Sequence, residues 1–290
     1  MTDSNFVIPF DRLPPNFAES LENPPEHPAP AQPAATIVLL RDGEKGMEVL
    51  LMRRSRSSGF VPGAYVFPGG RVDASDATPD LIERVDDLSA DNAASRLDLE
   101  DASPPAIAYY LAALREAFEE TGILVAHTAD GSAPQTAAES TDVDVLRDEL
   151  MDDRVSFAEV LDRLGCRIDG ASIEYLAHWI TPRPEPRRYD TRFFAAKVRA
   201  GAMPIVDPRE MTDAVWITPG GALERHEQGD LPMVFPTIMT LEQLSAHTST
   251  SDALTELSQR AVRTIMPTLV VTPTGVAMDL NEAGSGESPS

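Results

Sequence analysis

The segment from residue 106 to residue 122 constrains the fold of this chain more than any other part of its sequence. Wound as an α-helix at about 100° per residue, it places Ile107, Leu111, Leu114 and Phe118 within roughly 60° of one another on one side. A continuous apolar stripe of this kind is buried against another element in a folded protein. The segment therefore predicts an amphipathic helix that packs its apolar side into the core.

The opposite side of the same helix carries three glutamates. Glu116, Glu119 and Glu120 lie within about 100° of one another, because the spacings i, i+3 and i+4 stack side chains on one helical face. Like charges so close together repel one another unless a positive charge lies between them. The spacing leaves two interpretations open: a solvated acidic face, or a set of oxygen ligands for a hard cation such as Mg²⁺ or Mn²⁺.

Short apolar runs on both sides of this helix predict a sheet. Residues 35–40 and 47–52 are separated by turn residues and predict a hairpin, and residues 64–67 predict a third short strand. The remaining elements expected are strands at 179–180, 192–198 and 214–217, helices at 239–246 and 252–264, and a hairpin of 269–271 with 276–278. Gly122 is expected to end the glutamate helix.

The predicted organisation is one folded domain with additions. Residues 1–34 form a proline-rich lead-in, residues 35–280 form the domain, and residues 281–290 form a disordered tail. Within the domain, residues 74–103 predict a helical insert and residues 143–178 predict a further helical segment.

Charge narrows the classes of partner. The chain of 290 residues has 24 basic and 47 acidic side chains, a net charge of −23, which argues against nucleic acid and against an anionic membrane as partners. A small phosphorylated ligand stays possible because a bound cation can offset its charge. The single cysteine, Cys166, is either a packing residue or a nucleophile, and it excludes an internal disulfide. With no signal-peptide pattern and no apolar window of about 20 residues, the sequence predicts a cytoplasmic protein.

Two segments together resemble a known motif. Residues 115–123 read REAFEETGI, and residues 67–73 read FPGGRVD. They resemble the Nudix box, G-x5-E-x7-R-E-U-x-E-E-x-G-U, where U is a bulky apolar residue; Gly70 stands at its leading glycine. The sequence departs from the box in two places: Asp76 replaces the first glutamate, and 38 residues rather than seven separate Asp76 from Arg115.

A box interrupted at this point resembles the branch of the Nudix family that includes the peroxisomal coenzyme A diphosphatase. Residues 178–182, 188–194 and 216–219 are similar to that branch's downstream blocks, so the resemblance covers roughly residues 35 to 245. It implies an α/β fold, a Nudix-type α/β/α sandwich with a mixed sheet, here with helical insertions. It also implies metal-dependent hydrolysis of a diphosphate bond in a nucleoside-diphosphate-linked substrate, and suggests a homodimer.

The resemblance implies a role for each residue of the box. Glu116, Glu119 and Glu120 are expected to bind Mg²⁺ or Mn²⁺ and to take part in catalysis, with one of them or a distal glutamate as general base. Arg115 is expected to orient a glutamate through an i, i+4 ion pair. Asp76 reaches less far than a glutamate and is expected to be structural. The insert at 74–103 is either a helical cap on the sheet or a substrate-selecting lid.

Substrate is the part of the function that the sequence describes least. Arg53 and Arg54, with Arg56 nearby, and then Gly69 and Gly70 partly match a coenzyme A-recognising signature that precedes the box in some Nudix enzymes. Arginine suits phosphate because its guanidinium group donates paired hydrogen bonds. The same arginines can equally be ordinary residues at a strand end.

The function expected is hydrolysis of coenzyme A or acyl-coenzyme A. The alternatives are a pyrophosphatase for ADP-ribose or an NADH-like dinucleotide, or a catalytically silent Nudix-fold module that binds or regulates.

Overall fold

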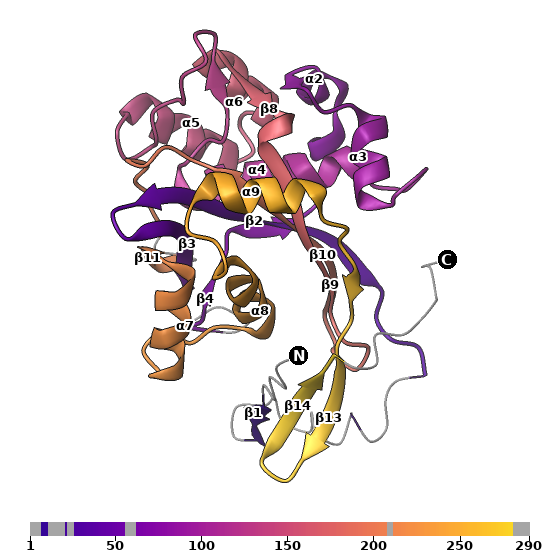
Figure 1. Cartoon of the computed structure of the whole chain (residues 1–290). Helices are drawn as coiled ribbons and strands as arrows, with labels where there is room; N and C mark the ends of the chain where they lie inside the picture. The colour runs from indigo at the N-terminus through magenta and orange to yellow at the C-terminus, as the bar shows by residue number, and fades with distance from the viewer. Residues whose placement is uncertain (1–6, 11–20, 22–25, 56–61, 208–210, 281–290) are drawn as a thin grey trace. The chain divides into compact units, whose positions relative to one another are not determined.

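The computed structural model describes all residues except 1–6, 11–20, 22–25, 56–61, 208–210 and 281–290 (Figure 1). The chain forms two compact units. The larger unit comprises Ala34–Leu176 and Arg192–Ala261, and the smaller comprises Met1–Pro33, Ala177–Thr191 and Val262–Ser290. Every residue of the predicted Nudix box belongs to the larger unit.

The larger unit is built on a sheet whose central strands are apolar on both faces. Its strands follow the order β11-β3-β2-β10-β9, with β4 beside β3 and β5 beside β2. Ile37 to Leu40 of β2 and Val49 to Met52 of β3 are completely buried, as expected for strands with a layer on each side. The bounds are β2 Ala31–Gly43, β3 Gly46–Arg54, β4 Tyr65–Val66, β5 Gly69–Arg71, β9 Ile173–Ile180, β10 Arg188–Lys197 and β11 Met211–Ile217.

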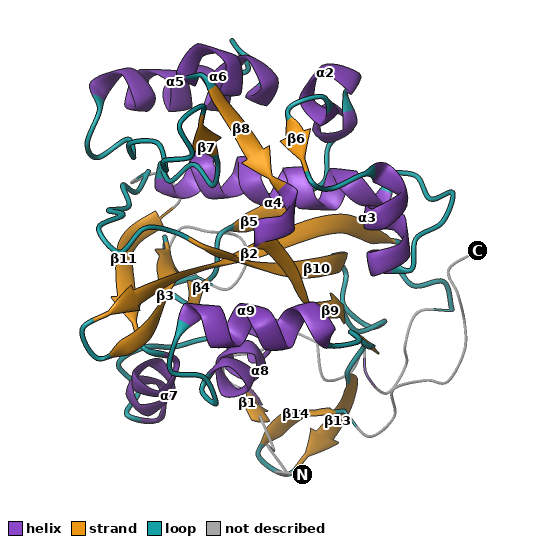
Figure 2. Ribbon diagram, turned by 45° about the horizontal axis from the view of Figure 1, so that its top comes forward, coloured by secondary structure: helices purple, strands orange, loops and turns teal. Residues whose placement is uncertain are grey.

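Helices cover both faces of this sheet. One face carries α4, and the other carries α7, α8 and α9 (Figure 2). Their bounds are α4 Ala106–Thr121, α7 Pro219–Glu227, α8 Phe235–Leu244 and α9 Thr250–Gln259. The predicted α/β/α sandwich is therefore confirmed, and α4 is the predicted glutamate helix. Of these helices α7 was not expected from the sequence, and α8 begins four residues before the predicted start.

A further layer of short elements lies on the α4 side of the sheet (Figure 2). The insert at 74–103 contributes part of this layer, and the chain between α4 and β9 contributes the rest. A small sheet with the order β6-β8-β7 ties the two parts together. The bounds are η2 Ala74–Ala77, α2 Pro79–Ile82, β6 Val85–Asp86, α3 Ala90–Leu97, β7 His127–Thr128, α5 Thr141–Met151, α6 Phe157–Leu164, β8 Cys166–Asp169 and η3 Gly170–Ser172.

The predicted helical segment 143–178 is wrong in its second half. Helices α5 and α6 end at Leu164, and the chain continues into β8 and β9. Ile173 to Ala177 of β9 are all buried, so this run lacks the polar alternation by which a strand is recognised in a sequence. Cys166 is buried in β8, and burial raises the pKa of its thiol, which favours the packing role over the nucleophile.

The smaller unit contains a three-stranded antiparallel sheet, β1-β14-β13, which includes the predicted C-terminal hairpin. Strand β12 pairs in parallel with the end of β9 at His178 and Trp179, which makes the sheet to which β9 belongs mixed. His178 Nε2 lies 2.6 Å from Asp190 Oδ1, and its Nδ1 lies 2.8 Å from Thr264 Oγ1. The bounds are β1 Val7–Pro9, β12 Thr264–Ile265, β13 Thr268–Thr272 and β14 Gly275–Asp279.

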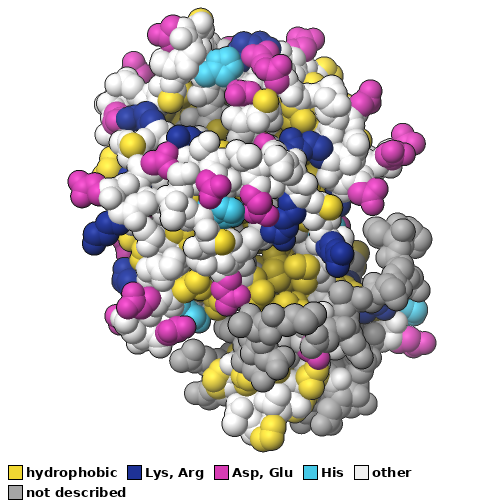
Figure 3. Space-filling model, in the orientation of Figure 1, with side chains coloured by type: hydrophobic (Ala, Val, Ile, Leu, Met, Phe, Trp, Pro, Cys, Tyr) yellow, Lys and Arg dark blue, Asp and Glu magenta, His cyan; other side chains and the backbone are white. Residues whose placement is uncertain are grey.

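The predicted lead-in and tail are only partly described. Strand β1 falls inside the lead-in, and β2 begins at Ala31, four residues before the predicted strand start. The tail 281–290 lies outside the described residues. On the face seen in Figure 3, Lys and Arg side chains stand singly or in small groups among acidic ones, in keeping with the net charge of −23. None of the helices in the described part of the chain has the length and apolar content to cross a membrane.

Candidate active site

Helix α4 is the element on which the site is built. Thirteen of its residues are buried, and those with greater exposure are Glu116, Glu119 and Glu120. The helix ends at Gly122, whose backbone is left-handed (φ 67°) and whose α-carbon faces Ala137 and Ile205 so closely that a Cβ would lie 2.6 Å from the Ala137 Cβ. Packing thus fixes both the rotation of the helix and the place where it stops.

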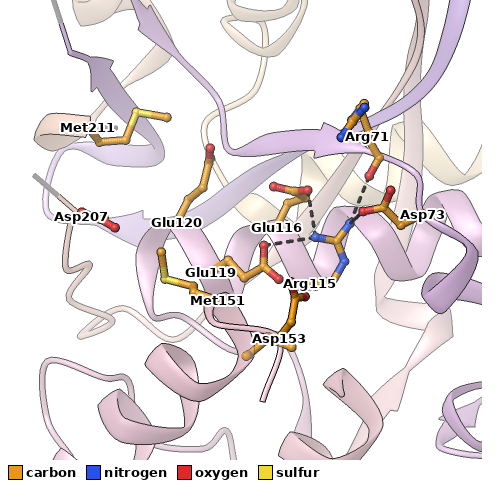
Figure 4. A pocket seen from close by; sticks show the side chains of 11 residues that line it. Arg71, Asp73, Arg115, Glu116, Glu119, Glu120, Met151, Asp153, Asp207 and Met211 are labelled. Carbon is orange, nitrogen blue, oxygen red and sulfur yellow. Dashed lines mark hydrogen bonds and ion pairs between the residues drawn. The ribbon is translucent and has the colours of Figure 1, made fainter. Parts of the chain in front are cut away.

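The three glutamates line one cavity of about 320 Å³ (Figure 4). Its other lining residues come from α4 itself, from β5 and the turn after it, from the end of α5 and the turn after it, and from the start of β11 and the chain before it. They are Arg71, Asp73, Arg115, Leu150, Met151, Asp153, Asp207 and Met211. Six of the eleven lining residues are acidic, so the cavity is suited to a cation rather than to an anion alone.

Arg115 is the centre of the site. Its Nε and Nη2 donate to the two carboxylate oxygens of Asp76 at 2.7 and 3.1 Å, and its Nη2 also donates to the Arg71 carbonyl at 3.0 Å. Its Nη1 donates to Glu116 Oε1 at 2.9 Å and to Glu119 Oε2 at 3.1 Å. The expected i, i+4 ion pair with Glu119 is therefore present. A buried guanidinium group held from several sides has one orientation available to it.

Asp76 holds its place in the box despite the insertion. It is completely buried, and besides Arg115 it accepts a hydrogen bond from the Asp73 N–H at 2.8 Å. Most of the insert follows Asp76 in the sequence and ends before α4, but in the folded chain its residues do not separate Asp76 from Arg115. The structural role expected of Asp76 agrees with these contacts.

Burial perturbs the carboxylates in the cavity. Desolvation raises the pKa of Glu116 to about 7, against the lowering effect of Arg115. Desolvation likewise raises the pKa of Glu119, where Arg115 again opposes it and the charges of Asp76 and Asp153 add to it. One guanidinium group therefore does not satisfy these two glutamates, and further positive charge would stabilise their ionised forms.

Gly69 and Gly70 bring strand β5 close to the glutamates. The Gly69 N–H donates to Glu120 Oε2 at 3.1 Å. A Cβ on Gly70 would lie 2.4 Å from Glu116 Oε1, and a Cβ on Gly69 would lie 2.5 Å from the Ala35 carbonyl oxygen. Both glycines are thus required by close approach, Gly70 to a site residue and Gly69 to the neighbouring strand β2.

Helix α5 supports the site from the side. Arg147, buried on α5, donates from Nε to the Glu119 carbonyl at 2.7 Å. That carbonyl lies in the last turn of α4, where carbonyls lack helical partners, so the cation both caps the helix and stabilises its negative end. After α5, Asp153 has a left-handed backbone (φ 55°) and lines the cavity.

Sequence reasoning missed several lining residues. Met151, Asp153, Asp207 and Met211 lie in no motif, and nothing in their local sequence points to a site. Arg71 stands inside the box but was assigned no function, although its place directly after Gly70 was a usable signal.

The role of Glu116, Glu119 and Glu120 as metal ligands stays a prediction. Among the described residues, no three His, Cys, Asp or Glu side chains are grouped closely enough to hold an ion. The physical reason is that Glu116 and Glu119 turn to Arg115 (Figure 4), whereas Glu120 accepts a hydrogen bond from the Gly69 N–H. The three carboxylates share the cavity but are not converged.

Of the arginines expected to bind substrate, the two that the structure describes, Arg53 and Arg54, do not line the cavity. Arg53 lies 5.7 Å from the Tyr65 ring centroid, and its Nε donates to the Gly63 carbonyl at 3.4 Å. Arg54 pairs with Met211 in the register of β3 and β11, and so ends near the cavity without lining it. Arg56 lies outside the described residues.

Comparison with known proteins places these observations in a family context. The family described as NUDT19 Nudix domain matches residues 27–244. The acyl-coenzyme A diphosphatase NUDT19 of Xenopus laevis is 28% identical over 241 residues, covering 73% of this chain and 63% of that protein. The human protein of the same name is 27% identical over 264 residues, covering 79% and 65%.

Among solved structures, a NUDIX hydrolase from Alicyclobacillus acidocaldarius is 29% identical with a TM-score of 0.65, covering 79% of this chain and 98% of that one. The chain therefore spans just under two thirds of the length of these curated relatives and nearly all of the bacterial hydrolase.

Proposed function

We propose, on the premise that the chain belongs to the NUDT19 Nudix domain family, that it is a metal-dependent hydrolase of a diphosphate bond in coenzyme A or acyl-coenzyme A. The observation that carries this proposal is the arrangement of Glu116 and Glu119 around the buried Arg115 in an acidic cavity. The names of the NUDT19 relatives support the substrate.

Glu116, Glu119 and Glu120 are the residues that would hold a divalent ion. Carboxylate oxygens are the ligands that Mg²⁺ and Mn²⁺ prefer, and all three line the same cavity. The raised pKa values of Glu116 and Glu119 fit a site that is short of positive charge. Arg115 engages one oxygen each of Glu116 and Glu119, which leaves the other oxygen of each carboxylate for an ion. Bound there, the metal would neutralise diphosphate oxygens and activate a water molecule.

The chain's own residues prepare the cavity for that chemistry. Arg115 keeps Glu116 and Glu119 oriented, and Asp76 keeps Arg115 in place. Arg147 fixes the end of α4 from which Glu119 and Glu120 project. Because Gly70 has no side chain, Glu116 can lie against strand β5. A carboxylate of this group takes the proton of the attacking water, as general base.

A substrate panel tests this proposal. The purified chain is incubated with Mg²⁺ or Mn²⁺ and with coenzyme A, octanoyl-coenzyme A, ADP-ribose or NADH, and the products are separated by chromatography. We expect cleavage of the coenzyme A substrates to adenosine 3′,5′-bisphosphate and a 4′-phosphopantetheine product. Preference for ADP-ribose or NADH would favour the alternative pyrophosphatase function.

Two variants complete the test. Glu119→Gln keeps the size of the side chain but removes its charge, and should lower turnover by about 100-fold or more. Glu44→Gln, at an exposed position in the β2–β3 turn, is the matched control and should leave turnover unchanged. If no diphosphate is cleaved by the parent chain, the protein is instead the silent binding module considered from its sequence. The cytoplasmic location and the homodimer stay predictions of the sequence.

A further inference from the structure

The cavity has two chemically different ends. In Figure 4, Arg71 and Asp73 lie at one end, Met151 and Met211 lie at the other, and the glutamates lie between them. A substrate whose diphosphate sits at the glutamates must extend its two halves toward these two ends. The chemistry of the two ends therefore determines the orientation in which the substrate binds.

Arg71 is the cation at the first end. Its carbonyl accepts a hydrogen bond from Arg115, and its backbone pairs with Ala34 in the register of β5 and β2. The start of its side chain is thus fixed beside the glutamates, whereas the side chain itself is exposed. Within the described part of the chain, its guanidinium group makes no hydrogen bond or ion pair. Arg115, the other arginine of the cavity, is fully engaged by carboxylates.

The second end carries the side chains of Met151 and Met211, with Asp207 beside them (Figure 4). Leu150 and Met151 come from the last turn of α5, and Met211 begins β11. Leu150 and Met211 are almost completely buried, and Met151 is half-buried. Thioether and leucine side chains offer no hydrogen bonds, but they adapt well to a flexible apolar chain.

We infer that the cavity binds its substrate in one direction, with a phosphate monoester of the nucleoside half at Arg71 and the apolar arm of the other half against Met151 and Met211. The inference rests on the proposed function and deepens it. In coenzyme A the nucleoside half carries a 3′-phosphate, and the other half is a pantetheine arm that ends in a thiol or an acyl group. An arginine pairs with a phosphate monoester through charge-assisted hydrogen bonds, and an acyl chain gains from leaving water.

The test compares three substrates: coenzyme A, 3′-dephospho-coenzyme A and octanoyl-coenzyme A. The ratio of kcat/KM for coenzyme A to that for 3′-dephospho-coenzyme A measures recognition of the 3′-phosphate. The ratio for octanoyl-coenzyme A to coenzyme A measures recognition of the acyl chain. Partial misfolding of a variant lowers every kcat/KM together and cancels in both ratios.

Arg71→Gln should lower the phosphate ratio by about tenfold or more, mainly through KM, and leave the acyl ratio unchanged. Met151→Gln should lower the acyl ratio by about fivefold and leave the phosphate ratio unchanged. The matched controls are Arg163→Gln, on α6 and outside the cavity lining, and Met203→Gln, an exposed methionine also outside it. Neither control should change either ratio.

Several results would overturn the inference. A parent chain that does not distinguish coenzyme A from its 3′-dephospho form contradicts it. An unchanged phosphate ratio in Arg71→Gln would show that Arg71 does not bind the 3′-phosphate. A reversed pattern, in which Met151→Gln changes the phosphate ratio, would give the opposite direction.

Binding measurements separate this inference from the proposed function. Isothermal titration calorimetry in the Glu119→Gln background, in which turnover is expected to be about 100-fold slower, gives the same two ratios from dissociation constants. If no substrate is hydrolysed but Arg71→Gln still abolishes the preference for the 3′-phosphate in binding, the proposed function fails and the direction of binding stands. If hydrolysis is observed and neither variant changes its ratio, the direction is wrong and the proposed function stands.

Discussion

Asp76 and Arg115 are 39 positions apart in the chain and form a buried two-contact ion pair, with Nε to Oδ1 at 2.7 Å and Nη2 to Oδ2 at 3.1 Å. In the sequence, helices α2 and α3 of the insert lie between Asp76 and Arg115. The remaining donor of the guanidinium group, Nη1, is thereby directed at Glu116 and Glu119. Within the described part of the chain, Asp76 makes no hydrogen bond to the three glutamates and acts on Glu116 and Glu119 through Arg115.

Removal of this ion pair should destabilise the protein. In Asp76→Ala the buried guanidinium group loses its closest partner, and we expect the free energy of unfolding to fall by about 3 kcal/mol, the lower end for a broken buried pair because Glu116 and Glu119 remain. Urea denaturation measures the change. Asp73→Asn is the control: Asp73 is half-exposed and 3.7 Å from Arg115, so its loss should cost less than about 1 kcal/mol. Equal effects in the two variants would contradict the importance of the buried pair.

Glu116 should control metal affinity. Glu116→Gln keeps the volume of the side chain but removes the charged oxygen ligand, and we expect Mn²⁺ binding, followed by electron paramagnetic resonance, to weaken by at least about tenfold. The reason is that loss of a direct ligand should lower metal affinity at least as much as loss of a group that only orients a ligand. Unchanged Mn²⁺ affinity would remove Glu116 from the proposed metal site. Glu224→Gln, at an exposed position on α7, provides the reference for nonspecific binding.

Gly69→Ala should mainly lower stability, whereas Gly70→Ala should mainly lower turnover. The new Cβ at position 69 meets the backbone of strand β2, which cannot move without breaking the sheet, so the free energy of unfolding should fall by about 1–3 kcal/mol. The new Cβ at position 70 meets the Glu116 carboxylate, a side chain that can rotate away. Gly70→Ala should therefore lose more turnover than stability. Thermal unfolding measures the loss of stability in both variants, and kcat measures the loss of turnover. A larger loss of stability than of turnover in Gly70→Ala would show that the close approach of Gly70 does not position Glu116.

Acid should weaken the attachment of α9 through Asp42. Hydrogen bonds from Lys197 and from the Thr250 backbone N–H lower the pKa of Asp42 to about 2. A folded-state pKa below the unfolded value stabilises the protein above about pH 4, and this stabilisation is lost as pH falls toward 2. Because Asp42 is partly exposed, its contribution is about 1 kcal/mol.

The variant Asp42→Asn isolates that contribution. The difference in unfolding free energy between the parent chain and Asp42→Asn should be constant from pH 7 to about pH 4 and should shrink below that. A difference that does not change with pH would mean that the charge of Asp42 plays no part.

The glutamate helix and the first hairpin could be predicted because their signals are local, whereas the sandwich was implied by the resemblance to the Nudix family. The apolar stripe of Ile107, Leu111, Leu114 and Phe118 and the stop at Gly122 lie within one helix length, and the runs in β2 and β3 lie next to each other. Strand β9 was predicted only at its end, since burial on both faces leaves no period to read. Helix α7 was missed because its two glycines and proline resemble a loop.

The spacing of side chains along one backbone was enough to predict which residues form the glutamate helix. The type of chemistry followed from the resemblance to the Nudix box, since the spacing alone left both an acidic face and a cation site open. Only the tertiary structure decided that Asp76 meets Arg115, that Arg147 caps the helix, and that Arg71 and Met151 face opposite ends of the cavity. These contacts join residues from separate elements. Their positions depend on how the elements pack, and no local pattern in the chain records that.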